Sequence, residues 1–238
     1  MLTANLDRLG LTSSDRVLDL GAGFGRHAFA ALRRGSTVVA LDAGEAEMEA
    51  VQGMITAMRE ANEISWDASA VAIRGDVLAL PFLDNSFDVV ICSEVLEHIP
   101  AEALAIAELA RVIKIGGRIA ITVPRTLPER INWALSDDYH NVPGGHIRIY
   151  SRSYLEQLLT NAQFRIEGHE YAHGLHSPYW WLKCLVGIER NEQWLVKRYH
   201  QLLVWDIMKS PRITRTLEQV LSKFIGKSLI IYATKMDK

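Results

Sequence analysis

The feature that most constrains the fold of this chain is the alternation of short apolar segments with helical ones. The apolar residues of each short segment are continuous, which is typical of strands that are buried on both faces of a sheet. Helical segments lie between most of the first five strands, and right-handed crossovers then favour a doubly wound fold. We therefore predict an α/β protein with a mostly parallel seven-stranded sheet. The seven predicted strands are residues 16–20, 37–41, 70–74, 87–92, 118–123, 164–171 and 228–234.

Several segments between the strands carry helix or loop signals. Three early glutamates in segment 45–60 suit the positive end of a helix dipole, and Ser151 is a typical N-cap residue. Gly116 and Gly117 are expected to break the chain before the fifth strand, and residues 126–145, which are rich in Pro, Asp and Gly, are predicted to form a loop. The predicted helices are residues 24–34, 45–60, 101–113 and 151–161.

Residues 173–227 separate the last two predicted strands and are too many for a hairpin connection. Three helical patterns in this stretch, at 180–188, 189–208 and 213–225, indicate a helical insertion before the last strand. We expect a single domain over residues 1–238 that carries this insertion.

Composition excludes several classes of protein. The chain has 238 residues, is 49% hydrophobic and 23% charged, and is therefore not disordered, collagenous or a disulfide scaffold. Cys92 and Cys184 lie far apart in apolar surroundings and are expected to be buried thiols of a reducing compartment. No apolar run approaches the ~20 residues of a spanning helix, and the N-terminus lacks a secretory signal. We therefore expect a cytoplasmic protein.

The formal net charge of -2 is divided unevenly along the chain. Residues 1–125 carry 11 basic and 17 acidic side chains, whereas residues 126–238 carry 15 basic and 11 acidic ones. The second part also holds five of the six tryptophans and six of the eight histidines. The second half of the chain thus differs from the acidic first half in being basic and rich in tryptophan and histidine.

The sequence DLGAGFG, residues 19–25, lies where the first strand meets the first helix. Glycine lets the backbone approach a ligand closely, and a helix N-terminus favours anionic groups. A dinucleotide-binding fingerprint would place its third glycine at position 26, which is Arg26. An NAD-dependent oxidoreductase is therefore disfavoured.

Together with the segments that follow it, this turn resembles that of the class I S-adenosylmethionine-dependent methyltransferases. In that family the second strand ends in an acidic residue, matched by Asp42, and a Gly-Asp pair follows the third strand, matched by Gly75 and Asp76. The segments LPFLDNSFDVV, CSEVLEHIP and ARVIKIGGRIAITVP resemble the family's approach to strand four, its exit into the active site and its fifth strand. The resemblance covers roughly residues 14–170.

The resemblance implies S-adenosylmethionine as the cofactor, and the chemistry of the residues agrees. Asp42 can accept hydrogen bonds from a ribose cis-diol, Asp76 can accept one from the adenine amine, and the Val77 N–H can donate to a ring nitrogen. A lone aspartate more often caps a turn, but here two of them follow consecutive strands. The implied cofactor-binding residues are Asp19, Gly21, Ala22, Gly23, Asp42, Ala43, Gly75, Asp76, Val77 and Ser93.

Residues beyond the fourth and fifth strands are candidates for the chemistry of the acceptor. His98 and His146 are the candidate catalytic residues, because a neutral imidazole can take a proton from a hydroxyl. The sequence EVLEH resembles that of the ubiquinone-biosynthesis O-methyltransferases. The set Glu94, Glu97, His98 and His146 resembles the magnesium ligands of the small-RNA 2′-O-methyltransferases. Three alternatives follow for these residues: they bind Mg²⁺, a histidine acts as a base without a metal, or Glu97 and His98 only shape the floor of the pocket.

The insertion is expected to govern substrate choice, either as a lid or as a membrane-contact element. It is rich in tryptophan, and residues 196–238 hold nine basic side chains against three acidic ones, so segment 178–227 can rest on the inner face of a membrane. The commoner role of such helices is to pack an auxiliary layer. The segment could roof the pocket, and His173 and His176 could then reach it. A histidine in a loop is more often a surface residue, so both are left out of the catalytic set. The lack of an RGG or lysine-rich tract makes nucleic acid an unexpected partner.

We predict that this chain transfers a methyl group from S-adenosylmethionine to a hydroxyl of a small molecule that is lipid-linked or glycosylated. Two alternatives are C-methylation of an activated ring carbon and a non-catalytic S-adenosylmethionine-binding protein.

Overall fold

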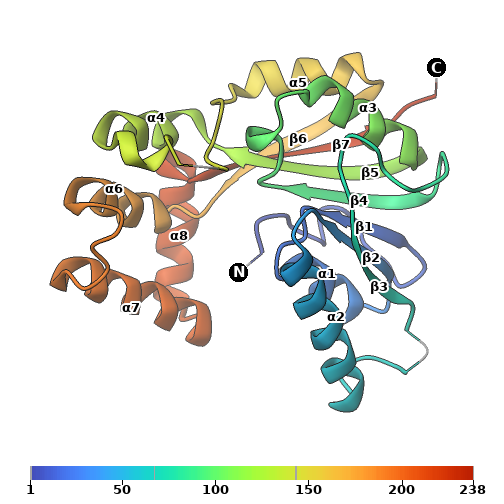
Figure 1. The fold of residues 1–238 in the computed structure, drawn as a ribbon, viewed down its shortest axis with the longest axis horizontal. Helices are drawn as coiled ribbons and strands as arrows, with labels where there is room; N and C mark the ends of the chain where they lie inside the picture. Colours follow the sequence, from blue (N-terminus) through green and yellow to red (C-terminus); the bar gives the residue numbers. More distant parts are fainter. Residues whose placement is uncertain (1, 67, 143, 238) are drawn as a thin grey trace.

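One twisted sheet with helices on both faces organises the protein (Figure 1). Over the described residues, 2–66, 68–142 and 144–237, the computed structural model contains a seven-stranded sheet in the order β3-β2-β1-β4-β5-β7-β6. Strand β7 runs antiparallel to both of its neighbours, and the other pairs are parallel. The predicted fold class is confirmed. The strands are β1 (Arg16–Leu20), β2 (Thr37–Asp42), β3 (Ala70–Arg74), β4 (Phe87–Ser93), β5 (Ile113–Pro124), β6 (Phe164–Ala172) and β7 (Ser228–Lys235).

Most of the helices follow the predicted segments, with ends that differ by a few residues. Ser151 caps the fifth helix as predicted, because its Oγ accepts a hydrogen bond from the Tyr154 N–H at 3.2 Å. The helices are α1 (Arg26–Leu32), α2 (Glu45–Glu60), α3 (Glu102–Val112), α4 (Thr126–Leu135), α5 (Arg152–Asn161), α6 (His176–Val186), α7 (Trp194–Lys209) and α8 (Arg212–Ile225), with short 3₁₀ turns η1 (Leu96–His98) and η2 (Asp137–Tyr139).

The sheet separates two hydrophobic cores, which explains why its strands are apolar on both faces. On β1, Leu18 packs into one core with Leu109 of α3 and Leu155 of α5. Its neighbour Val17 packs into the other core with Ala28 of α1 and the apolar side of α2. Figure 1 shows α1 and α2 on one side of the sheet and α3 and α5 on the other. This two-sided burial is the reason for the continuous apolar runs.

The chain changes direction in the sheet between β1 and β4. From β1 it proceeds to β2 and β3 on one side, and it then returns to β4 and β5 on the other. In such sheets, ligands bind outside the carboxyl ends of the strands at this switch point. The ends of β1, β2, β3 and β4 therefore define where a site is expected.

The loop predicted for residues 126–145 is wrong in its first part, because Thr126–Leu135 forms α4. Pro128 is the third residue of this helix, where the N–H that proline lacks would have had no partner within the helix. Asn132 and Glu129 lie on the buried side of the helix. Tertiary packing of this side favours the helix in spite of the proline.

Gly116 and Gly117 lie inside β5 rather than before it. The register between β4 and β5 shifts between Phe87 and Val89, so the glycines form an irregularity within a longer strand. Gly116 has φ +76°, a left-handed conformation that favours glycine. The break that the sequence predicts is therefore a bulge.

Helices α6, α7 and α8 connect β6 to β7, and they extend from the end of the sheet beside α4 (Figure 1). Helix α6 packs against α4 and α7, and α8 packs against β6. Among the described helices, none is both long and apolar enough to cross a bilayer. Cys92 and Cys184 are buried free thiols, as predicted.

Candidate functional site

The glycine-rich turn after β1 leaves no room for a larger residue at its first glycine. Gly21 has φ +65°, and a Cβ atom there would lie 2.1 Å from Cγ2 of Val95. The backbone N–H groups of Gly21 and Ala22 donate to the Leu41 carbonyl at 2.8 and 3.1 Å, which ties the turn to the end of β2. Glycine thus lets the turn pack against Val95, which follows the end of β4.

The side chain of Asp42 is fixed at the end of β2 by two backbone groups. Its Oδ2 accepts from the Gly23 N–H at 2.9 Å, and its Oδ1 accepts from the Gly44 N–H at 3.0 Å. A carboxylate has about four acceptor positions, so lone pairs are left for a ligand. The turn and the acidic residue that the sequence singles out therefore form one unit.

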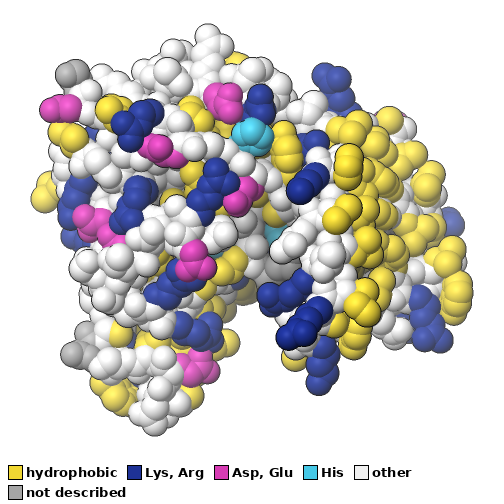
Figure 2. Space-filling model, turned by 180° about the vertical axis from the view of Figure 1, so that it is seen from behind, with side chains coloured by type: hydrophobic (Ala, Val, Ile, Leu, Met, Phe, Trp, Pro, Cys, Tyr) yellow, Lys and Arg dark blue, Asp and Glu magenta, His cyan; other side chains and the backbone are white. Residues whose placement is uncertain are grey.

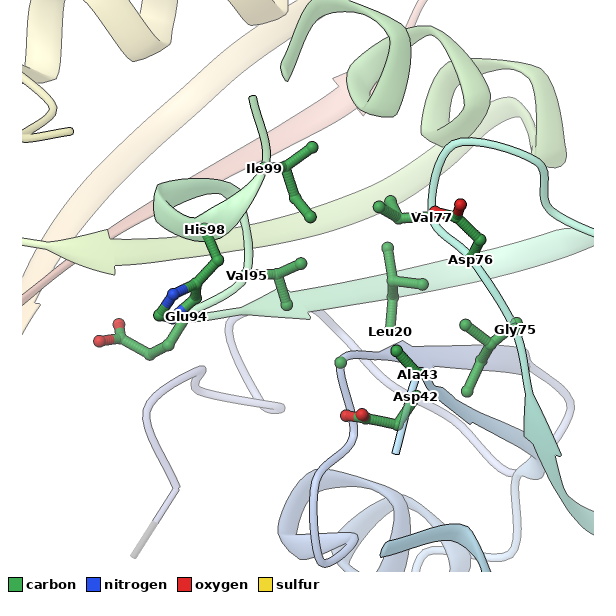
Figure 3. Close-up of a pocket in the computed structure, with 12 residues that line it drawn as sticks. Leu20, Asp42, Ala43, Gly75, Asp76, Val77, Glu94, Val95, His98 and Ile99 are labelled. Carbon is green, nitrogen blue, oxygen red and sulfur yellow. The ribbon is translucent and has the colours of Figure 1, made fainter. Parts of the chain in front are cut away.

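A cavity of about 230 Å³ lies at the switch point, and Figure 3 shows the residues around it. Six of the predicted cofactor residues line it, and Glu94 and His98 extend from its other end. Within the described residues, its lining is Leu20, Gly21, Leu41, Asp42, Ala43, Gly75, Asp76, Val77, Glu94, Val95, His98 and Ile99.

Four predicted cofactor residues, Asp19, Ala22, Gly23 and Ser93, are not part of this lining. Asp19 is fully buried, and its Oδ2 accepts from the Ala28 N–H at 2.8 Å, so it holds the start of α1. Burial raises the pKa of Asp19 to about 7. Ser93 is buried, with its Oγ 2.9 Å from the Thr122 hydroxyl.

The cavity fits the adenosyl part of S-adenosylmethionine. Asp42 and Asp76 place carboxylates on its wall, as the ribose hydroxyls and the adenine amine require. A Cβ on Gly75 would lie 2.9 Å from Cδ1 of Leu41, so the backbone of this wall is also closely packed. Leu20, Val77 and Ile99 supply the apolar surfaces between which a base can lie.

Glu94 occupies a strained position at the exit of β4. Its φ is +57°, which is uncommon for a residue other than glycine and costs of order 1–3 kcal/mol. Thr122 on β5 holds it there: the Glu94 N–H donates to the Thr122 carbonyl at 3.0 Å, and the Thr122 hydroxyl donates to Glu94 Oε1 at 2.9 Å. The neighbouring strand therefore fixes this carboxylate.

Three of the four residues of the predicted metal set come together, and Glu94 does not. Within the described residues, one ligand atom from each of Glu97, His98 and His146 lies within 4.8 Å of the others. Glu97 is fully buried, and neither of its carboxylate oxygens has a hydrogen-bond partner in the described structure. Burial and the negative charge of Glu94 raise the pKa of Glu97 well above its usual value.

Each of the two histidines is oriented through its Nδ1 atom. Nδ1 of His98 lies 3.3 Å from the Gly145 carbonyl, and Nδ1 of His146 lies 2.5 Å from Glu129 Oε1. A carbonyl oxygen only accepts, so Nδ1 of His98 carries a hydrogen, and in the neutral ring the lone pair is on Nε2. The two rings lie edge to face, with centroids 5.0 Å apart.

Glu129 is a site residue that the sequence analysis missed, because it lies in the segment predicted as a loop. It is fully buried on α4 and accepts from Trp133 Nε1 at 3.0 Å as well as from His146. Burial alone would raise the pKa of Glu129, but the hydrogen bond from His146 and the positive charge of that ring when it is protonated lower the pKa overall. A buried carboxylate thus positions His146.

A second cavity, of about 210 Å³, shares Glu94 with the first. His173 and His176 line it, although a surface position is the commoner expectation for a histidine in a loop. His173 is buried with its Nε2 3.0 Å from the Thr3 hydroxyl. The sequence signal for a shared site was that the two histidines lie three residues apart, directly after the predicted strand 164–171. The lining is Thr3, Arg26, Glu94, His173, His176, Trp180, Ile207, Lys227 and Ser228.

Comparison with known proteins matches residues 18–121 to a family described as "Methyltransferase domain". The ubiquinone/menaquinone biosynthesis C-methyltransferase UbiE of Dinoroseobacter shibae is 34% identical over 126 residues, which are 52% of this chain and 48% of that protein. The ubiquinone biosynthesis O-methyltransferase of Hahella chejuensis is 30% identical over 130 residues, 55% of this chain and 52% of that protein. This chain therefore spans about half the length of these relatives.

The solved structure of an S-adenosylmethionine-dependent methyltransferase from Methanosarcina mazei has the same fold. Its TM-score is 0.65 at 16% sequence identity, and the superposition covers 100% of both chains. At this identity the likeness concerns the fold alone. The family match ends at residue 121, so it includes the strands that build the first cavity and stops before His146, Glu129 and the insertion.

Proposed function

Residues 18–121 carry a methyltransferase domain of the class I S-adenosylmethionine-dependent family, and on this premise we propose that the chain methylates a hydroxyl of a small, lipid-linked or glycosylated acceptor. The observation that carries the proposal is the pair of cavities that meet at Glu94. The first has the groups that hold the cofactor. The second would hold an acceptor next to the first, on the side where the Glu94 carboxylate extends.

The residues of the first cavity hold and orient the cofactor. Asp42 would bind the ribose hydroxyls, Asp76 and Val77 would bind the adenine, and the Gly21 turn would hold the amino-acid part. When bound, S-adenosylmethionine supplies an electrophilic methyl group that a nucleophile attacks in line. Alignment of the two reactants accounts for much of the acceleration in such a step.

His98 is the group that we propose takes the proton from the acceptor hydroxyl. It lines the first cavity, and its Nδ1 lies against the Gly145 carbonyl, which leaves the Nε2 lone pair as a base. His146 lies directly against it and is fixed by Glu129, so this second ring can support or replace the first as the base.

The residues do not fit Mg²⁺ well, and the proposed reaction uses no metal. Magnesium prefers oxygen ligands in octahedral geometry, whereas the group Glu97, His98 and His146 offers two nitrogens and one carboxylate. Glu94, which would add a second carboxylate, is bound to Thr122 instead.

The second cavity favours an acceptor that carries a negative group. Arg26 and Lys227 both line it, together with His173 and His176. Trp180 adds an aromatic surface, over which the Lys227 ammonium lies 5.5 Å from the ring centroid. A phosphate or carboxylate close to the hydroxyl would pair with these cations.

Calorimetry on Asp42→Ala tests the cofactor site. We expect S-adenosylhomocysteine to bind the wild type, and its Kd to rise about 100-fold in the variant, because two hydrogen bonds to a charged acceptor are lost. Asp76→Ala is a second variant at an exposed site, and Glu49→Gln on the exposed side of α2 is the control that should bind as wild type. Tight NAD binding without S-adenosylhomocysteine binding would overturn the proposal.

Transfer itself is tested by incubating the protein and methyl-labelled S-adenosylmethionine with extracts of metabolites and lipids. We expect a labelled product with wild type and none with Asp42→Ala. A methyl ether in the NMR spectrum of the product supports O-methylation. A label on ring carbon would assign C-methylation, and no labelled product in any extract would favour a non-catalytic binding protein.

A further inference from the structure

Helix α8 presents its apolar side to the solvent and its polar side to the protein. Four apolar residues, Ile213, Leu217, Val220 and Phe224, follow the spacing of a single helical stripe, and all four are exposed. Ile213 is 82% exposed and Phe224 67%. The opposite side consists of the small polar residues Thr214 and Ser222, which are buried, and the half-buried Glu218. A helix that only packs on a domain has the reverse arrangement.

Helix α7 also exposes apolar side chains. Val196 and Leu203 are buried on its inner side, whereas Trp194, Leu202 and Trp205 are exposed. The alternative that these helices only pack an auxiliary layer does not fit Trp194 and Trp205, which are 66% and 47% exposed. The exposed apolar residues of the two helices are called the α7–α8 face below.

The charged side chains around the α7–α8 face are basic. Exposed cations on these helices are Lys197, Arg198, Lys209, Arg212, Arg215 and Lys223. Figure 2 shows dark blue side chains at the edges of the large yellow area on the right, while the acidic side chains in this view lie over the rest of the molecule. Lys197 pairs with Glu192, which precedes α7.

Both acidic residues of these two helices are directed to the interior. Asp206 is buried, and the carboxylate of Glu218 accepts from the backbone N–H groups of Gly174 and Leu175, each at 2.8 Å. The exposed surface of α7 and α8 thus combines apolar and cationic groups. A second copy of the chain would bring two faces of the same charge together, which opposes self-association.

We propose that the α7–α8 face docks on the surface of an anionic lipid bilayer. The apolar stripe of α8 would enter the boundary between headgroups and acyl chains, where the amphipathic rings of Trp194 and Trp205 are also favoured. The cations beside the stripe would lie against the anionic headgroups. Apolar area and matched charge together are what interfacial helices use to bind a membrane.

Docking would place the acceptor cavity beside the bilayer. Ile207 of α7 lines the second cavity, and Trp205, two residues before it, belongs to the α7–α8 face. A lipid-linked acceptor could then reach the cavity from the membrane. This consequence rests on the proposed function, whereas the docking itself does not.

Vesicle co-sedimentation of the full chain tests the proposal. We expect the protein to sediment with vesicles that contain phosphatidylglycerol, to bind pure phosphatidylcholine vesicles far less, and to lose binding as salt rises. Phe224→Glu should weaken partitioning about tenfold or more, and so should the double variant R212E/K223E. Leu104→Glu is the matched control, because Leu104 is an apolar residue of α3 that is 61% exposed and lies outside the face.

Binding of Phe224→Glu equal to that of the wild type, or no sedimentation with anionic vesicles, would overturn the proposal. A dimer in analytical ultracentrifugation that Phe224→Glu dissolves would also overturn it and would assign the face to self-association. Calorimetry with S-adenosylhomocysteine on Phe224→Glu should give the wild-type Kd. Failure of the membrane proposal is therefore distinguishable from failure of the proposed function.

Discussion

At the scale of single residues, the acceptor side of the site depends on contacts between distant parts of the chain. His98 is oriented by the Gly145 carbonyl, and His146 by Glu129 on a helix that the sequence did not indicate. The histidines themselves could be named from the sequence because imidazole is the usual general base. Their partners could not, because nothing in the sequence says which buried carboxylate a given ring will meet.

The proposed role of His98 makes a residue-scale prediction. His98→Ala should lower kcat by about 10²–10⁴, the usual contribution of a general base, while His98→Ala still binds S-adenosylhomocysteine. Wild-type activity should survive thorough treatment with EDTA. Loss of activity on chelation, with recovery on adding back a divalent cation, would contradict the metal-free mechanism and assign Glu97, His98 and His146 as ligands.

At the scale of elements, local signals were reliable where they act within a few residues. The Ser151 cap of α5 and the early glutamates of α2 are of this kind, because a cap or a dipole interaction involves only the first turn of the helix. The loop predicted for residues 126–145 was wrong in its first part for two reasons. Pro128 lies in the first turn of α4, where proline is tolerated, and burial of Asn132 and Glu129 favours the helix.

The α5 cap gives an element-scale prediction. Ser151→Ala should lower the free energy of unfolding by about 1 kcal/mol, since the Tyr154 N–H loses its acceptor. Urea denaturation measures this change. Ser153→Ala in the same turn is the control, because its hydroxyl bonds to Ser151 Oγ and caps no backbone group in the described contacts. Equal changes in the two variants would argue against the cap.

At the scale of the whole molecule, the N-terminal segment joins the two halves of the chain. The backbone N–H groups of Thr3 and Ala4 both donate to Nε2 of His27 on α1, at 3.3 Å, and the Thr3 hydroxyl contacts His173. The Asn5 N–H donates to the hydroxyl of Tyr232 on β7 at 2.9 Å. These contacts need a neutral, accepting His27, and burial lowers the pKa of His27 to about 3.

This buried imidazole predicts loss of stability in acid. Between its ordinary pKa of 6.5 and about 3, His27 gains a proton only when the protein unfolds. Its contribution to the free energy of unfolding is therefore fully present above pH 6.5 and is lost as the pH falls towards about 3. The slope from this group approaches about 1.4 kcal/mol per pH unit. Urea unfolding of His27→Gln between about pH 6 and pH 4 should show a correspondingly shallower dependence. A slope equal to that of the wild type would contradict the assignment.

The sequence by itself determined the α/β class, most of the order of strands and helices, and six of the residues that line the first cavity. These follow from hydrophobic periodicity and from residues such as Gly21, Asp42 and Asp76, which stand at successive strand ends and so meet at one edge of a parallel sheet. Tertiary structure alone decided the rest. It left Glu94 outside the group of Glu97, His98 and His146 and joined His146 to Glu129. It also brought His173 and His176 to a second cavity and turned the apolar stripe of α8 outward. Each of these depends on which surfaces pack together, and periodicity tells which side of a helix is apolar without telling whether that side is buried.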